Sequence, residues 1–215
     1  MAISRPVLGV SLISLLTACT GEKIASMSQA YKVGVGVSTL GLVVEPSRRI
    51  GPETAVRVPI AFGSAQTTAD IDGINYDVDG SVGGVGLMGD YYPGAGAFRV
   101  SGGLFKQNLE LNGRATGNVQ VGANAYVGVD LRTTGKPDNS IAPMVSIGFD
   151  GEVGQGWSIS TDVGAMYVGG FSVVARDEAG TVSASDLNAE VAAINSDLND
   201  VSIVPFISVG ASYRW

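Results

Sequence analysis

The most chemically suggestive residues form an acidic run in the first half of the chain. Between Asp70 and Gly80 lie four aspartates, one asparagine and two glycines. Calcium takes about six to eight oxygen ligands, and this run supplies candidates at Asp70, Asp72, Asn75, Asp77 and Asp79. An EF-hand register counted from Asp70 places Ile74, which has no side-chain oxygen, at the fifth position and Ser81 at the twelfth, where a glutamate is required. We therefore interpret the run as a solvated hairpin connection, keep calcium as the alternative, and predict no other metal site.

Residue types that act as general bases or nucleophiles are scarce. The sequence contains no histidine, which excludes Ser-His catalysis and histidine-ligated metal sites. Cys19 is the only cysteine, so no intramolecular disulfide forms, and its position near the N-terminus argues against a catalytic nucleophile. We predict that the protein is not an enzyme and uses no cofactor.

The N-terminus has the layout of an export signal. One positive charge in Met1–Arg5 precedes the short apolar run Pro6–Leu16, which is too short to span a bilayer. Leu16-Thr17-Ala18-Cys19 resembles the lipobox of bacterial lipoproteins, and this resemblance implies acylation of Cys19. An ordinary signal peptide cut a few residues away is the alternative. We predict a signal peptide at 1–18, a periplasmic segment at 19–30 and one folded domain at 31–215.

Composition narrows the fold class. Glycine occurs 31 times, and the net charge of −7 makes nucleic acid a poor partner. Mean hydropathy is +0.27, yet no apolar run after residue 18 approaches the roughly 20 residues that a membrane helix requires. The apolar residues therefore form a core or alternate along strands.

Strict alternation of apolar and polar residues predicts an all-β protein. The pattern is clearest in the last of eight segments: 31–45, 54–65, 75–91, 98–111, 118–132, 140–149, 157–168 and 201–215. The alternation changes phase near Ser38-Thr39, which predicts a β-bulge. Segment 118–132 has an alternative interpretation as half of a hairpin that projects beyond a membrane, which would change the strand count.

Eight antiparallel strands predict an up-and-down transmembrane β-barrel with both termini on one side. A helix is predicted at Ser185–Asn199, with Ser185 as N-cap, in the last long loop. With the C-terminus periplasmic, that loop is extracellular. We also expect Arg48-Arg49 in an extracellular connection, either as a solvated turn or paired with lipopolysaccharide phosphates.

Charged residues fall on the strand face opposite the apolar stripe. The predicted lumen charges are Arg57, Asp90, Arg99, Asp162 and Arg214. An eight-stranded barrel is just wide enough for side chains to fill, so paired charges would close it. A soluble barrel would alternate equally well. Aromatic residues at strand ends, glycine in place of Lys and Glu, and a chain that ends on a strand favour the membrane barrel.

The C-terminus carries a family resemblance. Trp215 as the last residue, with Tyr213, Ala211, Val209 and Ile207 at alternate positions before it, resembles the C-terminal signal of outer-membrane proteins. Together with Asp90–Pro93 and Phe98–Phe105, these residues resemble the outer membrane protein A transmembrane domain and the outer membrane protein W family. The resemblance implies recognition by the barrel-assembly machinery, contact with outer-membrane lipid and lipopolysaccharide, and a Gram-negative outer-membrane location. We expect a monomer.

The functional prediction is a structural or surface-interaction role in the bacterial envelope. One alternative is a narrow channel or a transporter of small hydrophobic compounds, which needs an apolar upper lumen with a lateral opening. A second alternative is a lipid-anchored soluble barrel, which needs an apolar interior cavity. Fold alone does not choose among these functions.

Overall fold

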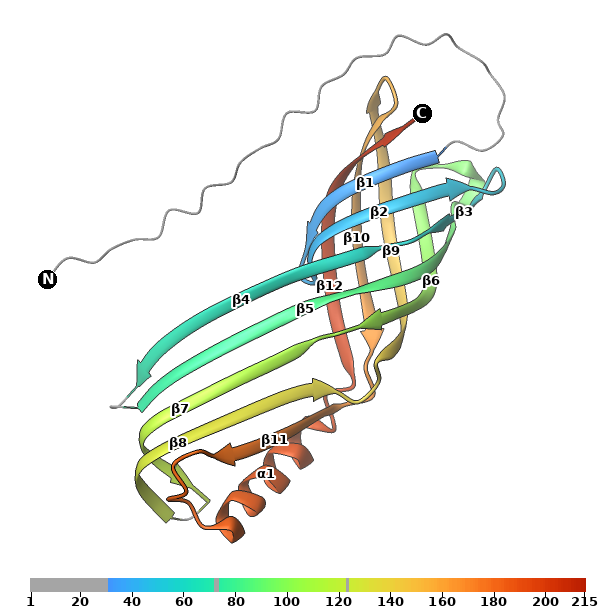
Figure 1. Ribbon diagram of the computed structural model, residues 1–215. Coiled ribbons are helices and arrows are strands. Elements are labelled where there is room, and N and C mark those ends of the chain that lie inside the picture. Colours follow the sequence, from blue (N-terminus) through green and yellow to red (C-terminus); the bar gives the residue numbers. More distant parts are fainter. Residues whose placement is uncertain (1–30, 72–73, 123) are drawn as a thin grey trace, which may run out of the picture.

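A computed structural model describes residues 31–71, 74–122 and 124–215, so the predicted signal peptide, Cys19 and the predicted periplasmic segment lie outside the described residues. The described chain forms a closed antiparallel barrel of eight strands, with further strands outside the ring and one helix (Figure 1). The ring runs β1 (Tyr31–Ser38), β2 (Gly41–Arg49), β3 (Thr54–Arg57) with β4 (Ile60–Ile71), β5 (Ile74–Tyr91), β6 (Phe98–Gln107), β9 (Ile141–Gly154), β10 (Trp157–Tyr167) and β12 (Ile203–Arg214). Pairing of β1 with β12 closes it.

Several strands with separate labels are single long strands with a local break. Against β2, Ser47 opposes Arg57 and Leu42 opposes Phe62, so the register continues unchanged from β3 into β4. The ladder is interrupted at Pro59, which has no N–H to donate. We therefore treat β3 and β4 as one strand of the ring.

Three strands continue beyond the barrel in the same way. β6 leads into β7 (Glu110–Val121), β8 (Asn124–Pro137) leads into β9, and β10 leads into β11 (Phe171–Asp177). The outer halves of β4 and β5 join β7, β8 and β11 in a five-stranded sheet that projects from one end of the barrel (Figure 1). We call it the projecting sheet. The projecting sheet lies at one end of the barrel, and Tyr31 and Trp215 lie at the other end. We call the end with Tyr31 and Trp215 the terminal end.

The predicted count of eight strands is confirmed, although two of the predicted boundaries were wrong. Segment 31–45 is a hairpin rather than one bulged strand, because β1 and β2 pair across a turn at Thr39-Leu40. Gly41 adopts a φ of +99° directly after that turn. Segment 118–132 is not a barrel strand: it contains the end of β7, a turn and the start of β8, at the tip of the projecting sheet.

The helix α1 (Ala184–Leu198) lies between β11 and β12, as predicted, but begins one residue earlier than expected. Its N-cap is Ser183, whose side chain accepts a hydrogen bond from the Asp186 N–H at 3.2 Å, rather than Ser185. Leu187, Val191, Ile194 and Leu198 are all partly buried, because they occupy the helix face that packs against the sheet. No described helix is both long and apolar enough to cross a membrane.

The outer surface of the barrel is apolar. Valine, isoleucine and leucine side chains on every ring strand are exposed, and aromatic residues collect where strands meet the terminal end. That aromatic set is Tyr31, Tyr91, Phe98, Phe149, Trp157, Tyr213 and Trp215. Tyr213 contacts both tryptophans, with ring centroids 5.2 Å from Trp157 and 6.4 Å from Trp215. The hydrophobic face thus points outward and the polar residues of each strand point into the lumen.

Candidate functional site

The lumen near the terminal end is filled by a network of charged side chains. Arg57 from β3 contacts three carboxylates, Glu45 at 2.9 Å, Asp90 at 3.3 Å and Asp162 at 3.5 Å. Alternation on strands from opposite parts of the ring points all four side chains inward. The structure therefore brings together Arg57, Asp90 and Asp162, which lie far apart in the sequence.

Arg99 from β6 forms the second centre of the network. It pairs with Asp162 through two of its nitrogens and with Asp150 at 2.7 Å. Asp150 also accepts a hydrogen bond from the Tyr92 hydroxyl at 2.7 Å and lies 3.0 Å from the Lys32 ammonium. Ser101 and Ser146 donate to Asp90 and Asp162, which satisfies further carboxylate oxygens. We call these ten side chains the lumen network: Lys32, Glu45, Arg57, Asp90, Tyr92, Arg99, Ser101, Ser146, Asp150 and Asp162.

Burial makes this network energetically important. Arg99 is 1% exposed and Asp162 is 2% exposed. A buried ion whose partner is removed costs several kcal/mol, whereas the intact pair roughly balances its desolvation. The network joins β1, β2, β3, β5, β6, β9 and β10 across the lumen. Its side chains fill much of the lumen in this half of the described barrel.

Arg214, the fifth predicted lumen charge, lies elsewhere. Its guanidinium pairs with Glu152 near the end of the barrel, and both side chains are largely exposed. Sequence reasoning also left Asp150 and Tyr92 out of the predicted lumen set. Both residues lie just beyond the ends of the alternating segments, so the alternation provided no signal for them.

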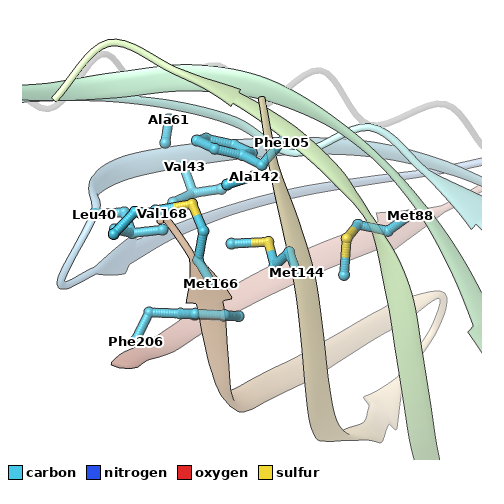
Figure 2. Close-up of a cluster of buried hydrophobic side chains, with 10 residues drawn as sticks. All are labelled: Leu40, Val43, Ala61, Met88, Phe105, Ala142, Met144, Met166, Val168 and Phe206. Atoms are coloured by element: carbon cyan, nitrogen blue, oxygen red, sulfur yellow. The ribbon is translucent and has the colours of Figure 1, made fainter. Parts of the chain in front are cut away.

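The other half of the lumen is apolar. Three methionines and two phenylalanines from five strands point into it and contact one another (Figure 2). Leu40, from the β1–β2 turn, lies over this apolar cluster, which consists of Leu40, Val43, Ala61, Met88, Phe105, Ala142, Met144, Met166, Val168 and Phe206. A cavity of about 30 Å³ separates the cluster from Glu45 and Arg57. That volume holds water but no substrate-sized compound.

The barrel-assembly signal residues lie on the outer face of β12. Ile207, Val209, Tyr213 and Trp215 are exposed to the barrel exterior, and Ala211 is partly buried between neighbouring strands. The backbone N–H of Trp215 donates to the Tyr31 carbonyl at 3.2 Å, which ties the C-terminus to the start of β1.

The acidic run becomes the β4–β5 hairpin of the projecting sheet. Asp72 lies outside the described residues, and Asp70 and Asn75 pair opposite each other in the hairpin. Asp77 accepts a hydrogen bond from Thr68 at 2.8 Å, and Asp79 is exposed. Among the described residues no group of three potential metal ligands converges. Calcium binding by this run stays an untested alternative.

Arg48-Arg49 lies at the terminal end, which corrects the expectation of a connection on the opposite side. Arg48 opposes Tyr31 in the β1–β2 ladder, and its guanidinium lies 5.1 Å from the Tyr31 ring centroid. Arg49 lies 3.8 Å from the Tyr92 ring centroid. The prediction was wrong because the first strand ends at Ser38 and not near Glu45. The chain turns there, and β2 brings Arg48 and Arg49 back to the end where β1 starts.

The two edges of the projecting sheet differ. At β11, the Asn195 side chain of α1 accepts from the Val173 N–H at 2.6 Å and donates to the Val173 carbonyl at 2.9 Å. This amide replaces the hydrogen bonds of a neighbouring strand and covers the edge. At β4, pairing with β2 ends at Phe62, so the remainder of β4 is an open edge.

Carboxylates fasten α1 to the tip of the β7–β8 hairpin. Asp186 accepts from the Tyr126 hydroxyl at 2.5 Å and the Asn124 amide at 2.7 Å, and Glu190 accepts from the Gly122 N–H at 3.0 Å. The Tyr126 hydrogen bond, with help from Asn124, holds the pKa of Asp186 below its ordinary value. No residue of α1 is fully buried, so these polar contacts are an important part of its docking.

Comparison with two solved structures from one organism supports the fold. The chain superimposes on CarO2 of Acinetobacter baumannii with a TM-score of 0.62 and 21% identity, over 86% of this chain and 98% of that one. CarO of the same organism gives 0.59 and 21%, over 86% and 97%. A major outer membrane protein from Thermus thermophilus gives 0.47 and 14%, over 87% and 98%. No protein-family model and no curated protein sequence matches the chain.

These findings define the class of the protein at the level of fold. The chain is an eight-stranded β-barrel of the type found in outer-membrane proteins, as predicted. At this identity the likeness to the CarO structures extends to the fold and carries no activity with it.

Replacing Arg99 tests the structural weight of the lumen network. Arg99→Gln leaves Asp150 and Asp162 without their main cation, and we expect it to destabilise the folded barrel by more than about 3 kcal/mol. Arg214→Gln removes an equal charge from an exposed pair and should cost less than about 1 kcal/mol. Urea unfolding in detergent micelles, followed by gel migration without boiling, measures both. Equal losses for the two variants would contradict the account. Adding Asp162→Asn to Arg99→Gln should recover part of the loss.

The docking of α1 should depend on pH in one direction. Because the pKa of Asp186 is depressed in the folded state, its stabilising contribution is complete above the ordinary carboxyl value and is lost as pH falls through the depressed one. Amide exchange in α1, corrected for intrinsic rates, should be constant between about pH 5 and 8 and quicken below about pH 4. In Asp186→Asn this acid step should shrink. An unchanged acid step in this variant would contradict the assignment to Asp186.

Proposed function

We propose that this protein is an outer-membrane barrel that does not conduct and presents the projecting sheet at the cell surface for interaction. The observation that carries the proposal is the combination of an outward apolar belt with buried ion pairs that join strands across the lumen. An exposed apolar surface of this extent is stable only against lipid or another apolar partner. Aromatic side chains at the terminal end suit the level of lipid head groups.

The orientation follows from the position of the termini. In single-chain outer-membrane barrels, the turns at the same end of the barrel as the two termini are short and periplasmic. The loops at the opposite end are longer and extracellular. Here the turns at 50–53, 92–97 and 155–156 lie at the terminal end, and the projecting sheet and α1 lie at the far end. The proposal therefore places the projecting sheet outside the cell and Trp215 where the barrel-assembly machinery acts.

A structural and interactive role fits the shape better than catalysis. Loops of membrane barrels are often mobile, but here most of the far end is regular sheet in register with the barrel, and α1 is fixed to it by side-chain hydrogen bonds. Rigid elements display binding residues at low entropic cost. With no histidine and one cysteine in the sequence, we propose that the protein is not an enzyme and functions without a cofactor, as a monomer.

Transport is the second candidate, and one observation favours it. The half of the lumen away from the terminal end is apolar and contains a small cavity lined by Leu40. A path for hydrophobic compounds requires such an apolar region. The floor of that cavity is the buried Arg57–Glu45 pair, which separates it from the terminal end. The lipid-anchored soluble barrel requires an apolar cavity inside and a polar surface outside. The described barrel has an apolar outer surface instead, and the cavity beside its apolar cluster measures only about 30 Å³.

Surface labelling tests the location and orientation together. Val127 on the projecting sheet is 76% exposed, and Ile50 at the terminal end is 65% exposed, so they form a matched pair for cysteine substitution. We expect a membrane-impermeant maleimide to label Val127→Cys in intact cells and Ile50→Cys only after permeabilisation. Wild type, which has Cys19 alone, sets the background. Labelling of Ile50→Cys but not Val127→Cys in intact cells would reverse the orientation. A protein released by high salt, with no shift in gel migration on boiling, would sink the membrane proposal.

A further inference from the structure

Three arginines form one row across the projecting sheet, on the face that continues the outer surface of the barrel. Arg114 on β7 opposes Arg132 on β8, and Arg132 opposes Arg176 on β11. Directly opposed residues of an antiparallel ladder share a face, and neighbouring strands lie about 5 Å apart. Like charges directly opposite one another destabilise a sheet. This row therefore carries an electrostatic cost that a bound anion would offset.

Nearby carboxylates neutralise the row unevenly. Arg114 forms two hydrogen bonds of 2.7 Å with Asp130, and Asp77 opposes it on β5, so Arg114 is the best neutralised of the three. Arg132 has Glu178 at 3.9 Å, with both side chains more than half exposed. Arg176 is exposed and has no carboxylate within ion-pair distance among the described residues. The available positive charge is thus concentrated at Arg132 and Arg176.

The row continues the lipid-facing side of the barrel. On β6, Leu104 points outward and is exposed, and Lys106 follows it in a row with the outward Val85 and Ile141. Lys106 is exposed and, like Arg176, lacks a carboxylate within ion-pair distance in the described part of the chain. Further out on the same face, Lys136 pairs with Glu110 at 2.7 Å. Cations therefore begin at the rim of the apolar belt and extend to the arginine row.

The distance between the apolar belt and the arginine row indicates which part of an outer-leaflet lipid reaches the arginines. Arg114 lies ten residues beyond Leu104, which is about 30 Å along an inclined strand. Acyl chains and the innermost head groups do not extend that far, but phosphorylated core sugars of an outer-leaflet glycolipid stand above them. Arginine binds phosphate in a bidentate manner with charge-assisted hydrogen bonds. Two adjacent, exposed and incompletely paired guanidiniums match that chemistry.

We propose that Arg132 and Arg176 bind phosphate groups on the core of lipopolysaccharide, with Lys106 contacting the same lipid nearer the belt. This inference rests on the proposed function, because it needs the projecting sheet on the outer-leaflet side. It assigns glycolipid contact to the projecting sheet rather than to Arg48-Arg49, which lie at the terminal end.

The test measures binding of lipopolysaccharide to the purified full-length barrel in detergent. The probes are rough-type lipopolysaccharide with a phosphorylated core and the same material after phosphatase treatment. We expect Arg132→Gln/Arg176→Gln to weaken binding of the phosphorylated probe at least tenfold. Arg48→Gln/Arg49→Gln removes the same charge from the opposite end and should change affinity less than twofold. Glu178→Gln frees Arg132 from its carboxylate and should strengthen binding.

Each outcome bears on the inference separately from the proposed function. Equal affinity of wild type and Arg132→Gln/Arg176→Gln would overturn it, as would equal affinity of wild type for the two probes. If that variant does not give a heat-modifiable band, the Glu178→Gln result decides: unchanged or weaker binding contradicts the inference. A barrel that is labelled at the surface but fails these binding tests retains the proposed function and loses only the glycolipid contact.

Discussion

The central constraint on this molecule is that its strands turn their apolar faces outward and their charges inward. An ordinary sheet protein gains stability by burying apolar side chains inside, but here the apolar face is outside and the interior near the terminal end is ionic. Buried ions are tolerated only where each has a partner of opposite charge and further hydrogen bonds. Arg57 and Arg99 meet this requirement by sharing Asp162 and dividing Glu45, Asp90 and Asp150 between them. Because these charges are paired with one another, the lumen near the terminal end can be filled by ionic side chains.

Continuity of the strands extends that constraint into the projecting sheet. β6 with β7, β8 with β9 and β10 with β11 are successive parts of the same strands, so the registers that align the lumen charges also set the rows of the sheet. The environment changes along each strand, and the residues change with it. The outward face is valine and leucine beside the barrel and becomes Asp77, Arg114 and Arg132 beyond it. One edge of this sheet is closed by Asn195, and the other remains open at β4.

Alternation allowed the fold class and the inward face of Arg57, Asp90, Arg99 and Asp162 to be predicted. The strand number is also correct, but only because the two wrong segments offset each other: 31–45 contains two ring strands and 118–132 contains none. Alternation did not identify which charges pair, because contacts such as Arg57 to Asp162 join residues 105 positions apart. The two wrong boundaries have local causes. A tight turn at Thr39-Leu40 changes the phase of alternation just as a bulge does, and Gly41 was the available sign of a turn. In segment 118–132, the turn changes the phase of alternation, and an irregularity in the β7–β8 ladder changes it back. This irregularity lies at the register shift near Gly117 and the left-handed Gly128, so the alternation in the sequence looks unbroken.

Single-channel recording in planar bilayers tests the central claim most directly. Purified wild-type protein, folded as judged by its shift in migration on boiling, should insert without producing discrete conductance steps in simple salt, because the lumen network joins seven of the eight ring strands across the lumen. Stable, ohmic conductance from the same preparation would contradict that account. The lumen network would then be a gate that opens rather than a plug, and transport would replace surface interaction as the function best supported.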